Sequence, residues 1–310
     1  MTAAALSAAE VARVTNDKPI LVGENILEGV THMKWFKGDE PSASVSSGTD
    51  RAEAGYATTR AYDRTAHATT RPQSALTQND WYLSWQIGTG KAFDMIMIGG
   101  HNFSSATSLT VSFEVADNAI FGSNLHTLAT WSNAHQSSKR LVSLSLKHTG
   151  SDPLRYTIDS TTPIGQYGRI KLDAGANWTP QIGEVWLGRR RHLPYEFDGP
   201  LDDKSTESIY SDFEARSGVR TRYVYSQGRA RRSVTTLIDD STDIATVDSF
   251  WSECGYGSKP FLMIDKPNTD AQRCYMMTHQ GGLDFPLTLP AARQLSLNMV
   301  ESAPFYSSES

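Results

Sequence analysis

Cysteine is scarce in this chain. Only Cys254 and Cys274 occur among its 310 residues. Two thiols cannot form a framework of several disulfides, and they cannot supply the four ligands of a structural zinc site. We therefore expect both side chains to fill space in a core as small apolar groups.

Long apolar runs are also missing. The sequence has no stretch of about 18 apolar residues, the length needed to span a bilayer. The first 14 residues lack a basic segment, and Glu10 interrupts their apolar run, so they do not have the pattern of a secretion signal. Ser7 and Glu10 have the spacing of a helix capping box. Residues 1–19 are expected to form either a frayed N-terminal arm or a short helix.

Neither sign of charge is in strong excess. The 29 Lys and Arg residues and the 34 Asp and Glu residues give a net charge of −5. This balance provides no general attraction to nucleic acid or to an anionic membrane. The hydrophobic fraction of 39% excludes wholesale disorder. The length predicts two domains, at roughly 150 residues each.

Recognisable catalytic motifs are absent. The eight His residues are scattered, and no two of them are four residues apart. The sequence has neither the Gly-x-Ser-x-Gly motif of a serine hydrolase nor a phosphate-binding P-loop. The carboxylates of Asp239, Asp240 and Asp243 could bind calcium, but they directly precede an expected helix and are better explained by capping. We therefore expect no enzyme activity, no cofactor and no metal site.

Short apolar or alternating segments dominate the rest of the first half. The clearest has Leu109, Val111, Phe113 and Val115 on one face of an expected strand. Further expected strands cover residues 94–99, 141–146, 155–158, 167–172 and 184–187. Because turn-forming residues separate them and no long helix intervenes, they predict a β-sandwich or jelly roll. Residues 39–78 contain few aliphatic side chains and are expected to form a long, ordered surface loop.

A domain boundary is expected where the arginine-rich residues 189–191 lead into an acidic connector. Beyond it, residues 218–225 and 229–238 flank a short segment that ends in Gly228, which predicts a β-hairpin. A helix is expected before Gly255, because four apolar residues recur at helical spacing: Ile244, Val247, Phe250 and Trp251. The second domain is therefore expected to be mostly β with one packed helix.

Arginine and tyrosine crowd the expected hairpin. The residues concerned are Arg220, Arg222, Tyr223, Tyr225, Arg229, Arg231 and Arg232. Both residue types are enriched at protein interfaces, and acidic residues lie nearby in the sequence. We therefore expect a subunit interface first, solvated strand faces second, and a nucleic-acid contact by charge and stacking third.

The order of several segments resembles a known family. The segments are residues 25–27, 55–63, 81–88, 93–102, 110–117, 155–158 and 182–188. Over about residues 20–188 they are similar to discoidin-like, galactose-binding-like jelly rolls, in the variant carried by tailed-bacteriophage virion proteins. Gln86 stands where that family often has Asp, and Arg71 lies near where a Trp is common. The second domain is similar in rhythm to the small β-sandwiches of distal tail and tail-tip proteins.

The resemblance implies a mainly β protein with two domains. We expect an arm or short helix at residues 1–19, a discoidin-like jelly roll at 20–188, a linker at 189–204, and a tail-type β-sandwich with one packed helix at 205–310. The implied function is that of a structural component of a phage distal tail, tail tip or baseplate. Such a protein would be made in the host cytoplasm without a signal peptide and would reside in the virion. Its partners would be copies of itself in a ring and other tail or baseplate proteins.

An alternative is a carbohydrate-binding module or adhesin that contacts host-surface glycans. A glycan site would need exposed aromatic side chains with polar partners at one loop end, because such domains bind at their loop tips. The candidate contacts are Trp35, Asp63, Arg71, His101 and Asn102. Both interpretations describe a non-enzymatic protein.

Overall fold

The computed structural model describes residues 19–64, 68–76, 78–87, 92–122, 125–136, 140–144, 146, 156–157, 166–192, 205–214, 220–239, 243–264, 267, 274–281, 287–289 and 292–302. Within these ranges the chain is mainly β with a single α-helix, which confirms the expected fold class. The chain divides into two compact units. Residues 24–190 form what we call the jelly-roll unit, and residues 191–302, together with 19–23, form what we call the C-terminal unit.

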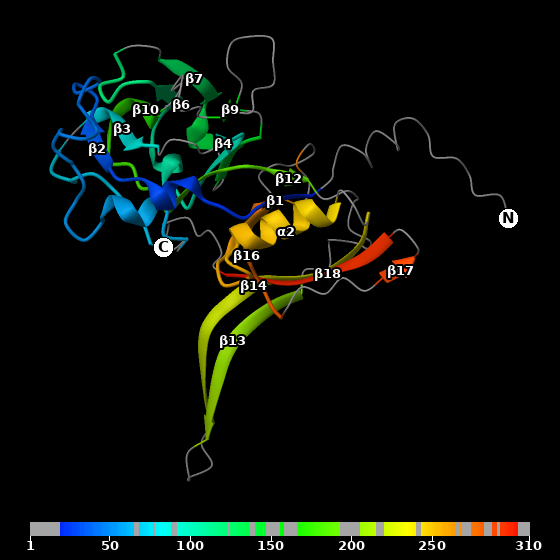
Figure 1. Cartoon of the computed structure of the whole chain (residues 1–310). Helices are drawn as coiled ribbons and strands as arrows, with labels where there is room; N and C mark the ends of the chain where they lie inside the picture. The colour runs from blue at the N-terminus through cyan, green and yellow to red at the C-terminus, as the bar shows by residue number, and fades with distance from the viewer. Residues whose placement is uncertain are drawn as a thin grey trace. The chain divides into compact units, whose positions relative to one another are not determined.

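The jelly-roll unit is built on two antiparallel sheets (Figure 1). The five-stranded sheet has the order β2 (Met33–Lys37), β3 (Gln78–Gln86), β10 (Tyr167–Trp178), β6 (Leu109–Ala116) and β7 (His126–Trp131). The three-stranded sheet has the order β11 (Glu184–Gly188), β5 (Met95–Gly99) and β8 (Arg140–Ser143), and β4 (Ala92–Phe93) pairs with β9 (Tyr156–Thr157). The connections contain the 3₁₀ helices η1 (Ile26–Gly29), η2 (Thr58–Ala61), η3 (Phe103–Ser105) and η4 (Ala134–Gln136). A five-stranded sheet that faces a three-stranded one forms the expected jelly-roll sandwich.

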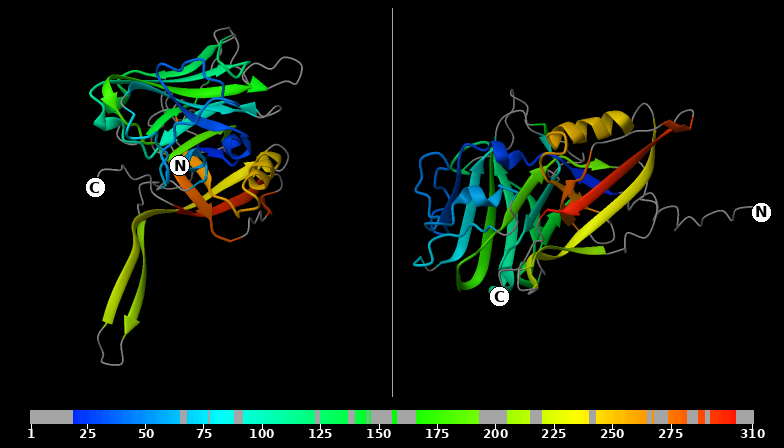
Figure 2. Two further views of the ribbon diagram at one scale, coloured as in Figure 1. Left: turned by 90° about the vertical axis from the view of Figure 1, so that its left-hand side faces the viewer. Right: turned by 90° about the horizontal axis from the view of Figure 1, so that it is seen from below.

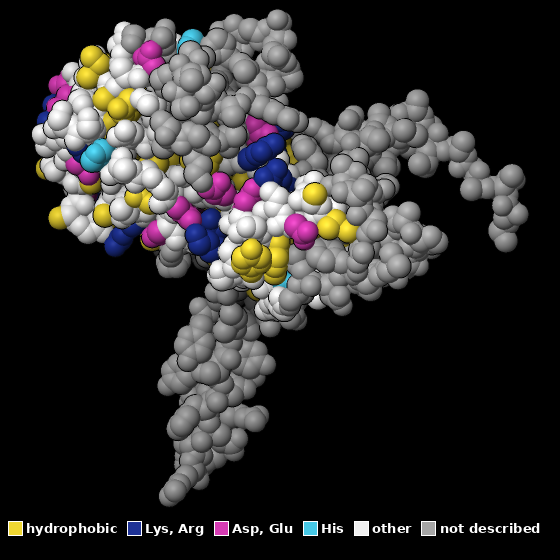
Figure 3. Space-filling model, in the orientation of Figure 1, with side chains coloured by type: hydrophobic (Ala, Val, Ile, Leu, Met, Phe, Trp, Pro, Cys, Tyr) yellow, Lys and Arg dark blue, Asp and Glu magenta, His cyan; other side chains and the backbone are white. Residues whose placement is uncertain are grey.

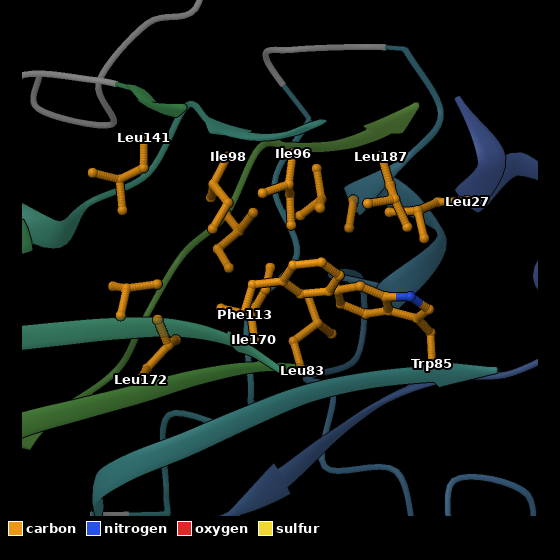
Figure 4. Close-up of a cluster of buried hydrophobic side chains, with 14 of the residues drawn as sticks. Leu27, Leu83, Trp85, Ile96, Ile98, Phe113, Leu141, Ile170, Leu172 and Leu187 are labelled. Carbon is orange, nitrogen blue, oxygen red and sulfur yellow. The ribbon is translucent and has the colours of Figure 1, made fainter. Parts of the chain in front are cut away.

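The core of this unit lies between the two sheets. The predicted inward-facing residues of β6 (Leu109, Val111, Phe113 and Val115) are all buried, which confirms the alternation read from the sequence. Figure 4 shows side chains of the five-stranded sheet, such as Leu83 and Phe113, pointing toward Ile96 and Leu187 of the other sheet. The ring of Trp85 stacks on Phe113, with centroids 5.9 Å apart.

A glycine makes room for this indole. Gly168 of β10 lies directly opposite Trp85 of β3. A Cβ atom at residue 168 would be 2.7 Å from the indole nitrogen, closer than real side chains approach. Glycine in a strand often marks such a close approach, and the sheet here would have to shift to accept any other residue.

The long connection between β2 and β3 closes one side of the sandwich. The indole nitrogen of Trp35 in β2 donates to Thr70 Oγ1 at 2.9 Å, and Thr70 forms a β-bridge with Ile182, two residues before β11. A second bridge joins Ala52 to Pro72 within the connection. The described part of the expected surface loop is therefore tied to the edge strands of both sheets.

The C-terminal unit is built on one sheet. Its order is β12 (Arg191–His192), β1 (Ile20–Val22), β15 (Phe261–Ile264), β16 (Cys274–His279), β18 (Ala292–Glu301), β14 (Arg220–Asp239) and β13 (Ser205–Glu214), and β17 (Leu287–Leu289) pairs with β18. The single helix, α2 (Asp243–Glu253), lies along one face of it (Figure 2). Phe250 is buried and packs edge-on against Phe261, with centroids 5.0 Å apart. Trp251 is half-buried against the same cluster. Cys254 and Cys274 are buried and form no disulfide, as expected.

Two of the expected boundaries differ from the structure. Residues 20–22 were expected in the jelly roll, but β1 pairs with β15 of the C-terminal unit. Arg191 and His192 were expected in a linker, but they form β12 and pair with β1; residues 193–204 lie outside the described ranges. An apolar triplet such as Ile20–Val22 fits the interior of any sheet, so the sequence alone does not identify its partner strand.

The expected hairpin turn at residues 226–228 is also wrong. Strand β14 runs without interruption through Gly228, and the hairpin is formed by β13 and β14 instead. The β13–β14 register shifts on both sides of the pair Ile209 and Ser226. Glycine within a strand often marks such an irregularity, which a sequence pattern cannot distinguish from a turn.

Candidate functional site

Trp35 was expected to be an exposed aromatic contact, but the structure buries it. Its side chain is fully buried in the core of the jelly-roll unit. The ring packs edge-on against Trp81, with centroids 6.4 Å apart, and its nitrogen donates a hydrogen bond to Thr70 Oγ1. This tryptophan supports the long β2–β3 connection from inside.

The expectation that His101 is a surface contact is also wrong. Only 2% of it is exposed, and its imidazole stacks on Phe103 with centroids 4.0 Å apart. Burial lowers the pKa of His101 to about 4, so the ring is neutral at neutral pH. The neighbouring Asn102 is bound within the fold, because its Nδ2 donates to Thr179 O at 3.0 Å and its Oδ1 accepts from Gln181 N at 2.7 Å.

Asp63 is exposed beside a cluster of charged side chains. Next to it, Arg64 has a φ of 58°, forms an ion pair with Glu28, and places its guanidinium carbon 4.8 Å from the ring centroid of Trp186. Glu184 is fully buried nearby. Burial, reinforced by the charge of Asp63, raises the pKa of the Glu184 carboxyl well above its usual value. Among the described residues, no three His, Cys, Asp or Glu side chains form a group that could hold a metal ion.

Arg71 is the predicted contact that the structure places in a suitable setting. Its guanidinium carbon lies 3.8 Å from the ring centroid of Tyr56, and that of Arg60 lies 5.8 Å from the same centroid. The Nε of Arg71 donates to Glu53 Oε2 at 2.6 Å. A hydrogen bond fixes the backbone at Tyr56, since Thr70 Oγ1 donates to the carbonyl of Tyr56 at 3.1 Å.

Tyr56 and the two arginines near its ring form what we call the Tyr56–Arg60–Arg71 surface. It is the best candidate binding site of the jelly-roll unit. It combines one half-buried aromatic ring with two cationic groups, only one of which is paired with a carboxylate within the described residues. Sequence reasoning identified Arg71 but missed the other two residues as site members. The four-residue spacing from Tyr56 to Arg60 is a local signal, whereas the approach of Arg71 depends on the bridge between Ala52 and Pro72.

The arginine-rich strand of the C-terminal unit is described by its backbone register. Arg220 lies opposite Glu214, Arg222 opposite Asp212, and Arg229 opposite Glu207. Arg231 lies opposite Ser205 and Val300, and Arg232 opposite Met299. The side chains of the seven candidate interface residues, Tyr223 and Tyr225 included, lie outside the described part of the structure, so the expected interface stays a prediction.

No family model matches the sequence, and no curated protein matches it. Among the described residues, none of the helices has the length and apolar character needed to cross a membrane. Several solved structures resemble this chain at low sequence identity.

The carbohydrate-binding module CBM32 of AlyQ, in complex with 4,5-unsaturated mannuronic acid, is 15% identical with a TM-score of 0.30, over 44% of this chain and 90% of that chain. The lectin domain of lectinolysin, complexed with Lewis B antigen, is 13% identical with a TM-score of 0.33, over 54% and 96%. Chitosan-binding module 1 of a chitosanase/glucanase from Paenibacillus sp. IK-5 is 12% identical with a TM-score of 0.31, over 44% and 86%. Likenesses this weak assign no ligand to this chain.

Proposed function

We propose that the jelly-roll unit binds a glycan that carries a carboxylate or sulfate group. The supporting observation is the placement of Arg71 and Arg60 around the ring of Tyr56, with guanidinium carbons 3.8 Å and 5.8 Å from its centroid. Guanidinium groups recognise planar anions through paired, charge-assisted hydrogen bonds. The ring holds these groups at the surface, where an anionic ligand can reach them.

The charge of the surface favours an anion. Glu53 balances Arg71, but within the described residues no carboxylate is paired with Arg60. One positive charge therefore remains uncompensated next to the ring. In the described residues Arg71 uses only its Nε in a hydrogen bond, so its terminal nitrogens stay available to a ligand oxygen.

The surface is also accessible. Ala54, Gly55 and Ala57 flank Tyr56, and all three are exposed and small. Gly55 has a φ of 86°, a left-handed conformation that glycine adopts at no steric cost. Tyr56 itself is half-buried, and none of these three neighbours has a side chain long enough to cover its ring. A sugar could therefore lie against the ring while its acidic group meets the arginines.

The test compares an oligogalacturonate with its carboxyl-reduced, neutral counterpart. We expect the acidic form to bind more tightly, and Arg60→Ala and Arg71→Ala each to weaken its binding roughly tenfold, the loss typical of one charged hydrogen bond. Lys37→Ala is the matched control, since Lys37 belongs to the same unit but is paired with Asp39. Equal binding of the two ligands, or unchanged binding by both arginine variants, would contradict the proposal.

A second candidate function is that of a structural subunit of a phage tail or baseplate in the virion. The observation that favours it is the length of β14, which pairs with β13 along residues 220–231 and with β18 along residues 231–239. Among the described strands, the β13–β14 hairpin has no other neighbour along its outer half. Unpaired strand edges are natural points of contact with other chains.

Electron microscopy of negatively stained protein tests this second function. Closed rings of several copies would support a tail subunit. A monodisperse monomer at high concentration, with a separate particle for each chain, would count against it and leave glycan binding as the remaining proposal.

Both functions are non-enzymatic, and we extend the proposal to the absence of turnover. The two described groups with the largest pKa shifts, His101 and Glu184, are buried and do not reach the surface. The check is to incubate the protein with the same oligosaccharides and measure new reducing ends. Release that disappears in the Asp63→Asn variant would overturn this part of the proposal.

A further inference from the structure

The chain has a strained conformation just after α2 in the C-terminal unit. Gly255, Tyr256 and Gly257 all have positive φ, of 56°, 56° and 83°. Glycine adopts this left-handed region easily, but for a bulky side chain such as tyrosine it is strained. Strained residues of this kind cluster at functional sites, where the strain serves a purpose other than stability.

The hydrogen bonds of this turn form a Schellman motif. Gly255 N donates to Ser252 O and Tyr256 N donates to Trp251 O, each at 2.9 Å. The residue that follows the glycine in this motif usually packs an apolar side chain against the last helical turn, which would place Tyr256 on Trp251. Instead, Tyr256 is 74% exposed. Gly257 lies against the indole in its place, because a Cβ there would be 2.5 Å from Trp251 Cη2.

The tyrosine ring is therefore directed away from the fold. Tyr256 has a left-handed backbone conformation and a side chain that is mostly exposed, and the glycines on both sides of it contribute no side chain that could cover the ring. Meanwhile Trp251 is held from the other side by His279, edge-on with centroids 5.0 Å apart. The core gains nothing from the tyrosine ring, so its role lies outside the fold.

Polar residues lie next to Tyr256 along the chain. Ser252, Ser258 and Lys259 are exposed, and Ser258 Oγ donates to Gly255 O at 2.7 Å while keeping its lone pairs available. Among the residues of this unit whose side chains the structure describes, Tyr256 is the only large hydrophobic one that is exposed. Figure 3 shows that exposed hydrophobic side chains form small, separate areas among polar and charged ones on the described part of this face.

We infer that Tyr256 is a stacking platform for a neutral saccharide, a binding site separate from the Tyr56–Arg60–Arg71 surface. A pyranose ring offers a C–H face about as large as one aromatic ring, with hydroxyl groups around its edge. An exposed, amphipathic tyrosine with serine hydroxyls and a lysine within four residues of it along the chain can match both parts. A protein partner would need about 800 Å² of well-packed surface on each side, which a lone ring among polar groups does not provide.

The experiment uses affinity electrophoresis of the full chain in gels that contain hydroxyethyl cellulose, galactomannan or soluble starch. The background is the Arg60→Ala/Arg71→Ala variant, which removes the first surface. We expect at least one of these neutral polysaccharides to retard the protein. Tyr256→Asn should weaken that binding by about tenfold or more, as expected for the loss of one stacked ring. Tyr256→Phe should keep it.

Asn is the informative substitution because it tolerates the left-handed conformation. We expect Tyr256→Asn to leave the melting temperature unchanged or to raise it. The inference is overturned if no neutral polysaccharide retards the protein, or if the Tyr256→Asn variant binds as tightly as the parent. It is also overturned if Tyr256→Asn lowers the melting temperature as much as the loss of a buried side chain does. A change in sedimentation mass with Tyr256→Asn would overturn it in favour of a self-contact. Failure of the acidic-glycan site would appear in the separate arginine experiment and would leave this one intact.

Discussion

Arg169 of β10 and Glu114 of β6 lie directly opposite each other, with 2.6 Å between Nε and Oε2. The guanidinium carbon of Arg169 lies 4.7 Å from the ring centroid of Tyr82 and 4.4 Å from that of Phe121. Both charged residues are buried. The pair thus occupies the centre of a second apolar cluster, which includes Phe36 and lies on the opposite face of the five-stranded sheet from the main core.

We predict that Arg169→Met will destabilise the jelly-roll unit by about 3–5 kcal/mol, because it leaves Glu114 buried without its partner. The double variant Arg169→Met/Glu114→Leu should recover most of this loss, since no charge then stays buried. Urea unfolding followed by circular dichroism measures both values. A single-variant loss below about 1 kcal/mol would mean that water reaches the pair.

The titration of His101 predicts a loss of stability in acid. Burial lowers the pKa of His101 from 6.5 to about 4 in the folded chain. Its contribution to stability is therefore fully present above the unfolded pKa and is lost as the pH falls from about 6.5 toward 4, by up to about 3 kcal/mol. His101→Phe, which can still stack on Phe103, should flatten this dependence. The measurement is the melting temperature of the parent and of His101→Phe at pH 7.5 and at pH 4.5. An equal drop in melting temperature for both proteins would refute this prediction.

Glu184 predicts the opposite dependence on pH. Burial and the nearby Asp63 raise the pKa of its carboxyl, while Arg64 lowers it to a smaller extent. A folded-state pKa above the unfolded one means that the stabilising contribution is present in acid and lost as the pH rises through the folded pKa. Glu184→Gln mimics the protonated form, so it should stabilise the protein increasingly as the pH is raised. Chemical unfolding at pH 5 and pH 8 tests this, and a loss of stability at pH 8 would contradict it.

The arginine-rich strand predicts a difference between two pairs of variants. Arg222 lies opposite Asp212, so the swap Arg222→Asp/Asp212→Arg keeps this pair within the hairpin and should disturb a subunit interface less than the loss of an unpaired charge. Arg231 and Arg232 have no carboxylate opposite them, so Arg231→Glu/Arg232→Glu should prevent assembly while the chain stays folded. Sedimentation at low and high salt measures both, and added salt should weaken the parent assembly too. If the Arg231→Glu/Arg232→Glu chain assembles normally, these arginines are not at an interface.

The parts of the fold that the sequence predicts are those with a local pattern. In β6 every second residue is apolar, and the structure buries all four of those side chains. In α2, the residues Val247 and Phe250 are buried as their spacing predicted, and the helix ends just before Gly255. Both patterns arise from the geometry of a single element, so one sequence is sufficient to read them.

The candidate site depended on contacts that no local pattern contains. Trp35 and His101 look like binding residues because aromatic and imidazole groups suit ligands, yet both are buried in the tertiary fold. Thr70 reaches the nitrogen of Trp35 across 35 positions of sequence. Tyr56 acquires its partner Arg71 only because the β2–β3 connection folds back on itself. Burial and long-range closure are properties of the tertiary fold, and they decide which polar residues remain accessible.

The pairing of β1 with β12 places Leu21 directly opposite Arg191. The chain thus leaves the C-terminal unit after β1 and returns to it at β12, at neighbouring positions in one sheet. Residues 24–190 are therefore an insertion between two neighbouring strands of the C-terminal unit. A short turn between β1 and β12 could therefore replace residues 24–190, and a different module with adjacent termini could be inserted at the same position while the sheet of the C-terminal unit is kept.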